Sequence, residues 1–77
     1  MKERLLSVFR RTFKSEDIDE TISQNNYGKW DSLNHLNLAV EIEKEFNIIL
    51  EPEEIGRIKN FSDAEKIILE KLANDTI

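Results

Sequence analysis

Hydrophobic residues recur at helical spacing in three long stretches of this 77-residue chain, and a polar stretch separates the first two. Residues three and four positions apart lie on one face of an α-helix, so each stretch predicts a helix with a buried face. We expect these helices from Lys2 to Phe13, from Leu33 to Phe46 and from about Ser62 onwards. The residues expected to face the core are Leu5, Leu6, Phe9, Phe13, Leu38, Ala39, Ile42, Phe46, Ala64, Ile67, Ile68 and Leu72.

The segments between these helices carry their own signals. Pro52 to Ile58 predicts a short helical turn, because proline suits the first helical position and acids suit the N-terminal end. Ser62 with Glu65 forms a possible capping box for the last helix, and Asn60 is the alternative cap. The polar stretch from 15 to 30 predicts a long ordered loop, held by four apolar anchors: Ile18, Ile22, Tyr27 and Trp30. The pattern indicates an all-α fold in a single domain, residues 1–77.

The second long helix has two apolar stripes. Leu33, Leu36 and Val40 cluster away from the core face, so this second stripe is expected to meet solvent or a partner. Asp31 suits the N-cap, which leaves Ser32 at the first helical position, pointing outwards. There the helix dipole would stabilise a phosphate ester by roughly 0.3 to 1 kcal/mol.

The motif Trp30-Asp31-Ser32-Leu33-Asn34-His35-Leu36, running into the acidic helix Glu41-Ile42-Glu43-Lys44-Glu45-Phe46, resembles the acyl carrier protein family. The resemblance covers nearly the whole chain and implies a small four-helix bundle of the acyl carrier type, with three main helices, one short helix and a long first loop. It also implies that a phosphopantetheinyl transferase attaches 4′-phosphopantetheine from coenzyme A to Ser32, with Asp31 and Leu33 as the flanking motif residues. The arm's thiol would carry acyl groups as thioesters. Many members have Gly where this chain has Lys29, which suits a discrete, pathway-specific carrier in fatty-acid, polyketide or other specialised biosynthesis.

Charge is unevenly distributed. The net charge is −5, of which residues 1–14 contribute +4 and the remaining residues −9; between Asp31 and Glu54 there are seven acids and one base. This field predicts encounter with acyl-loading and acyl-processing enzymes that have basic docking surfaces, and repulsion of nucleic acid. The residues expected to dock are Leu33, Leu36, Val40, Glu41 and Glu43. A plain solvated face is the alternative for each acid, and the basic first helix is expected to be a core helix neutralised by the rest of the chain.

Two ring residues near Ser32 have alternative interpretations. Trp30 either contacts the arm or a partner, or closes the base of the loop against the core, and the second is favoured. His35 is interpreted as a satisfied, partly buried histidine and not as a catalytic base, because no oxyanion site or orienting third group accompanies it. The acids Glu51, Glu53 and Glu54 lack the spacing of a calcium loop, so no metal site is predicted.

Composition narrows the function further. There is no cysteine, so a working thiol must come from a prosthetic group, and this fits a cytoplasmic protein. No apolar run approaches the roughly 20 residues of a membrane span, so no membrane insertion is expected. We expect a monomeric, non-catalytic carrier that serves as a covalent cosubstrate. The alternatives are an aminoacyl or peptidyl carrier, such as a D-alanyl carrier, and an unmodified helical interaction module.

Overall fold

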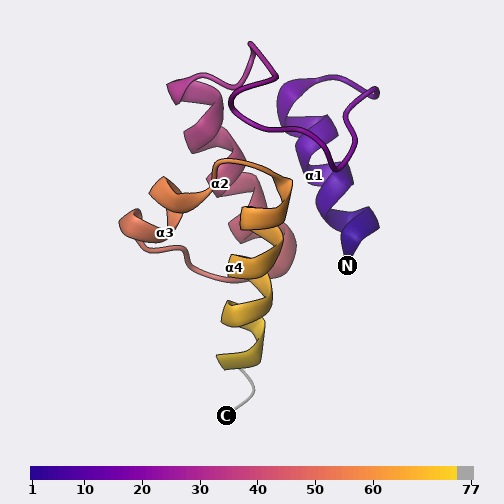
Figure 1. Ribbon diagram of the computed structural model, residues 1–77. Coiled ribbons are helices and arrows are strands. Elements are labelled where there is room, and N and C mark those ends of the chain that lie inside the picture. Colours follow the sequence, from indigo (N-terminus) through magenta and orange to yellow (C-terminus); the bar gives the residue numbers. More distant parts are fainter. Residues whose placement is uncertain (75–77) are drawn as a thin grey trace.

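The computed structural model describes residues 1–74, which form the four helices shown in Figure 1. Helix α1 spans Lys2–Phe13, α2 Ser32–Phe46, α3 Pro52–Arg57 and α4 Phe61–Asn74. Within the described residues, β-structure is limited to one isolated bridge between Ser23 and Asn60. The predicted all-α bundle of three main helices and one short helix is confirmed. None of the helices in the described part of the chain is long and apolar enough to cross a membrane.

The helix ends follow from local capping chemistry. Lys14 and Asn47 adopt the left-handed conformation after α1 and α2, and their N–H groups donate to carbonyls in the last turn. At the start of α4, the Asn60 side-chain oxygen accepts from the Asp63 N–H at 2.7 Å. Of the two candidate caps, Asn60 is therefore the one that makes the capping bond, and α4 begins at Phe61, one residue from the expected start of about Ser62.

The core is one continuous cluster of buried side chains from α1, α2, α4 and the connecting segments, including the long loop. Helix α3 packs against this cluster through half-buried Ile55. Phe9 lies at its centre with no exposed surface, and its ring lies 5.6 Å from that of Trp30 and 5.5 Å from that of Phe61. All of the predicted core residues are buried except Leu72. Leu72 is half-buried and packs against the cluster, and Ile55 of α3 does the same. The core also contains residues that the helical pattern did not predict: Ile48, Leu50 and Phe61.

The loop between α1 and α2 is ordered, as predicted, and three of its four anchors are buried. Its backbone is joined to the α3–α4 connection, where the Gln24 N–H donates to the Lys59 carbonyl at 2.9 Å and the Phe61 N–H donates to the Ile22 carbonyl at 3.2 Å. Arg10 fixes it from α1 by donating to the Ile18 carbonyl at 2.8 Å. Figure 1 shows this loop at the end of the molecule where α2 begins. The loop therefore fixes the surroundings of Ser32.

Candidate modification site

Ser32 is the first residue of α2, and its side chain is exposed. Asp31 caps the helix by accepting from the Asn34 N–H at 2.9 Å with its carboxylate and from the His35 N–H at 2.8 Å with its carbonyl. Within residues 1–74, the N–H groups of Ser32 and Leu33 and the Ser32 hydroxyl have no protein partner. A phosphate ester on the Ser32 oxygen would therefore meet free N–H donors at the positive end of the helix dipole.

A second contact fixes the loop to this end of α2. The Asn34 side-chain nitrogen donates to the Lys29 carbonyl at 2.8 Å. Asp31 and Asn34 thus hold the last loop residues and the first helical turn in one geometry, and the Ser32 hydroxyl is presented from a fixed backbone.

Buried Trp30 and half-buried His35 form a hydrogen-bonded pair beneath the site. The Trp30 ring is 6% exposed, and its Nε1–H donates to His35 Nδ1 at 2.9 Å. Because Nδ1 accepts, Nε2 carries the proton of the neutral ring and donates to the Ile55 carbonyl on α3 at 2.8 Å. The two rings are stacked, with centroids 6.1 Å apart. Both favoured interpretations are confirmed: Trp30 closes the base of the loop against the core, and His35 is a satisfied structural histidine that joins the loop, α2 and α3.

The second stripe of α2 is exposed, as its position in the helix predicts. Leu33 is 69% exposed, Leu36 58% and Val40 47%. The three side chains follow one another along α2 from the residue after Ser32, and a contiguous exposed apolar patch of this kind is a surface suited to contact with another protein. The structure places all three predicted apolar docking residues on this one surface.

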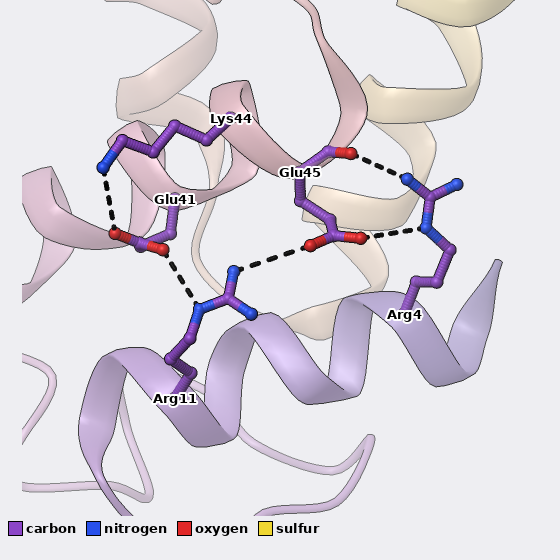
Figure 2. Close-up of polar contacts among 5 residues, drawn as sticks. All are labelled: Arg4, Arg11, Glu41, Lys44 and Glu45. Atoms are coloured by element: carbon purple, nitrogen blue, oxygen red, sulfur yellow. Dashed lines mark hydrogen bonds and ion pairs between the residues drawn. The ribbon is translucent and has the colours of Figure 1, made fainter.

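The acids of α2 have partners within the protein. Figure 2 shows Glu41 and Glu45 turned towards α1, where Arg11 Nε lies 3.1 Å from Glu41 and Arg4 Nε lies 3.0 Å from Glu45. Arg11 also lies 3.6 Å from the Glu45 carboxylate, and Lys44 lies 3.8 Å from that of Glu41. The basic face of α1 is therefore neutralised by acids of the same chain, as expected. Glu41 lies on the α1 side of α2 instead of projecting freely beside the exposed stripe.

Glu43 has a structural contact that sequence reasoning missed. Its carboxylate accepts from the Leu50 N–H at 2.8 Å, after the chain turns back at Asn47. Leu50 is one of the buried residues that helical spacing did not predict, so no periodicity pointed to this contact. The left-handed Asn47 that ends α2 was the available sign that the chain reverses here.

No group of three or more His, Asp or Glu side chains among residues 1–74 is arranged to hold a metal ion. The carboxylates of the α3 region are used in capping and pairing. Glu54 accepts from the Glu51 N–H at 2.8 Å and pairs with Lys71 at 2.9 Å. The Glu51 N–H and, after it, Lys71 lower the pKa of Glu54 below its ordinary value.

Comparison with known proteins agrees with this geometry. No family model matches the chain, and no curated protein matches it. Among solved structures, the chain is similar to a solution NMR structure of a holo acyl carrier protein from Geobacter metallireducens, with 32% identity and a TM-score of 0.84. The match covers 95% of this chain and 86% of that one. The fold is thus that of a small helical carrier domain. At this identity and coverage, the chain belongs to the acyl carrier protein family.

Proposed function

We propose that this carrier is modified at Ser32 by 4′-phosphopantetheine and presents acyl intermediates to biosynthetic enzymes. The observation that carries the proposal is the exposed Ser32 hydroxyl at the start of α2, in the Asp31-Ser32-Leu33 motif that the family resemblance identifies. When bound, the group supplies a flexible arm whose terminal thiol holds acyl groups as thioesters. Asp31 fixes the helix start, and the N–H groups of Ser32 and Leu33 stabilise the phosphate charge.

Attachment is a phosphoryl transfer catalysed by a phosphopantetheinyl transferase. The Ser32 oxygen forms a new bond to the phosphorus that bears pantetheine, and the pyrophosphate bond of coenzyme A breaks. Adenosine 3′,5′-bisphosphate leaves, and the hydroxyl proton passes to a base of the transferase. The chain contributes an accessible nucleophilic oxygen and a surface for the transferase, so it acts as a cosubstrate and not as the catalyst.

The docking surface of the proposal is the exposed stripe of Leu33, Leu36 and Val40, with Glu41 and Glu43 at its rim. The stripe is the part that the transferase and the acyl-processing enzymes would cover. Glu43 contributes negative potential that attracts basic enzyme surfaces, although its carboxylate also accepts from the Leu50 N–H. Glu41 is paired with Arg11, so it acts only at close range, where a basic side chain of the enzyme can replace Arg11. We propose further that the carrier is pathway-specific, because Lys29 stands where many family members have Gly. The absence of cysteine favours a cytoplasmic protein.

Mass spectrometry after incubation with coenzyme A and a broad-specificity phosphopantetheinyl transferase tests the attachment. We expect the wild type to gain the mass of one arm and Ser32→Ala to gain none. Ser62→Ala is a matched control, because Ser62 is an exposed serine in the first turn of α4, and this variant should load like the wild type. An unshifted wild-type mass would contradict the proposal and favour an unmodified interaction module.

The cargo requires a separate measurement. We would purify the protein from its native cells and identify the group released from the thiol by mild base. A fatty or polyketide acyl group is expected. Recovery of an amino acid would replace the acyl assignment with an aminoacyl carrier and leave the Ser32 attachment intact.

A further inference from the structure

Trp30 and His35 lie on either side of the start of α2. Asp31 is the N-cap and Ser32 the first helical residue, so Trp30 precedes the cap and His35 is the fourth helical residue. Apolar side chains at these two positions often pack together as a hydrophobic staple, which fixes how the chain enters the helix. Here the two rings are also joined by a hydrogen bond of 2.9 Å from Trp30 Nε1 to His35 Nδ1. We name this pair the Trp30–His35 staple, and Ser32 lies within the segment that it closes.

The staple requires an uncharged imidazole. His35 Nδ1 accepts from Trp30, and a ring nitrogen can accept only while it carries no proton. Nε2 donates to the Ile55 carbonyl at 2.8 Å, and it keeps its proton when the ring becomes charged. Protonation therefore breaks the contact to the loop and leaves the contact to α3 in place. Two N–H groups would then face each other, and Trp30, which is only 6% exposed, would lose its acceptor.

The surroundings of His35 offer no ion pair to a protonated ring. Among residues 1–74, the ring nitrogens contact Trp30, Ile55 and, at longer range, Gln24, and no carboxylate contacts them. The acid closest in sequence, Asp31, has its carboxylate on the Asn34 N–H. The other charged side chains on the adjoining segments are Lys29 before α2 and Glu51, Glu53, Glu54, Arg57 and Lys59 around α3. The start of α2 adds the positive potential of its free N–H groups, so the closed staple accommodates the neutral ring only.

Gln24 provides an alternative partner for the protonated ring. Its Nε2 lies 3.5 Å from His35 Nδ1, a long contact to a nitrogen whose single lone pair already accepts from Trp30. Rotation of the side-chain amide by half a turn replaces its nitrogen with its oxygen, which is an acceptor. The Gln24 N–H donates to the Lys59 carbonyl, so the backbone that carries this amide is fixed. The ring can thus exchange Trp30 for Gln24 when Nδ1 gains a proton.

We infer that His35 is a positioning residue for the modification of Ser32 and that it acts only as the neutral imidazole. This inference rests on the proposed function. In the neutral form, the Trp30–His35 staple joins the loop end to α2 and presents the Ser32 oxygen from a fixed helix start. Protonation of Nδ1 transfers the ring to Gln24 and frees the loop end. Attachment at Ser32 should therefore slow as the pH falls through the range of about 5 to 8, in which histidines change charge.

Opening of the staple is distinct from unfolding of α2. Asp31 still caps the helix through the Asn34 N–H, and Asn34 still donates to the Lys29 carbonyl, because neither contact involves the ring. We therefore expect the far-ultraviolet circular dichroism signal to stay constant over the same range of pH. The change is confined to the placement of the loop end beside Ser32.

The indole N–H signal of Trp30 tests the opening on the protein without an arm. Trp30 is the single tryptophan, so its signal in a ¹H–¹⁵N spectrum is unambiguous. We expect this signal to titrate together with the His35 ring protons in the wild type and to stay constant with pH in His35→Gln. Gln24→Met, which removes the amide acceptor, should move the transition to lower pH, and Asn25→Ala, an exposed neighbour, should leave it unchanged. An indole signal that ignores the titration of His35 would overturn the inference.

The rate of arm attachment tests the positioning role. We would measure kcat/KM for attachment by the broad-specificity transferase, with both chains folded, and take the ratio of the wild type to His35→Gln so that titration of the enzyme cancels. The ratio should be near one at about pH 8, since glutamine can make both hydrogen bonds, and should fall several-fold by about pH 6. A ratio that does not change with pH would overturn the positioning role and leave the attachment at Ser32 standing. A chain that accepts no arm at any pH would contradict the proposed function itself.

Discussion

The pair formed by Trp30 and His35 allows a quantitative test of how the site is held. His35→Phe keeps a ring that can stack on Trp30 and removes both ring nitrogens. The variant leaves the buried Trp30 N–H and the Ile55 carbonyl without the partners that they have at 2.9 and 2.8 Å. A buried polar group that loses its partner destabilises the protein by about 1–3 kcal/mol.

For the two groups together, the loss in the free energy of unfolding should be about 2 kcal/mol, because Ile55 is only half-buried and water can reach its carbonyl. A domain of this length is stabilised by roughly 4–12 kcal/mol, so the change is a large fraction of the whole. For a domain of this size, it corresponds to a melting temperature lower by about 8–16 °C. Thermal unfolding followed by far-ultraviolet circular dichroism measures this shift.

His35→Gln is the control, because a glutamine amide can both accept from Trp30 and donate towards Ile55. We expect it to recover part of the lost stability and to load at Ser32 like the wild type at temperatures where it is folded. A His35→Phe protein that melts with the wild type would refute the structural role. Folded His35→Gln that no longer loads would show that the imidazole takes part in the chemistry.

Three further predictions concern the surface and the α3 region. Leu36→Asp should slow loading by the transferase severalfold without lowering the melting temperature, since Leu36 is exposed; equal loading rates would exclude the stripe from docking. Glu43→Leu should destabilise the protein by about 1 kcal/mol in urea unfolding by removing the acceptor of the Leu50 N–H, whereas Glu43→Gln keeps an acceptor and should show only the effect of charge on loading. The lowered pKa of Glu54 makes its carboxylate stabilising above its ordinary pKa, and this contribution is lost as the pH falls through the folded-state value. Glu54→Gln should therefore be less stable than the wild type by up to about 1 kcal/mol at neutral pH. A gap that persisted in acid would contradict a stabilising role for the ionised carboxylate, which accepts from the Glu51 N–H and pairs with Lys71.

The three long helices could be predicted from the sequence because each buries one continuous face, and that requirement produces the 3,4 spacing of apolar residues. Helix α3 has no buried residue and was predicted from Pro52 and the acids that follow it. The sequence left the start of α4 open between two caps, because Asn60 and Ser62 both have capping chemistry. The choice depends on a tertiary contact: the Phe61 N–H pairs with the loop carbonyl of Ile22, and the Phe61 ring packs on Phe9. Ile48 and Leu50 were missed for a related reason, since they lie in a non-helical connection, where burial has no period.

The position of Ser32 at the helix start could be predicted because an N-cap is a local feature that needs only the neighbouring residues. The hydrogen-bond partners of His35 could not be predicted in this way. Trp30 is five positions away across a loop end, and Ile55 is twenty positions away on another helix. The same applies to the α2 acids: a helical projection separates Glu41 from Glu43, but only the packing of α1 against α2 shows which carboxylates face Arg4 and Arg11.

These ion pairs change how the negative field of the chain should act on a partner. On the α1 side of α2, Arg4 and Arg11 balance Glu41 and Glu45, so little net charge remains there at distances beyond the roughly 8 Å of physiological screening. At the start of α3, Glu51 and Glu53 are exposed and have no ion pair among the described residues. An exposed ion pair stabilises a protein by only about 0–1 kcal/mol, so an arginine of a partner enzyme can replace Arg11 at close range. A neutral pair does not attract that arginine from a distance. We therefore expect the basic surface of an enzyme to approach from the α2–α3 side, with the apolar stripe deciding the final contact.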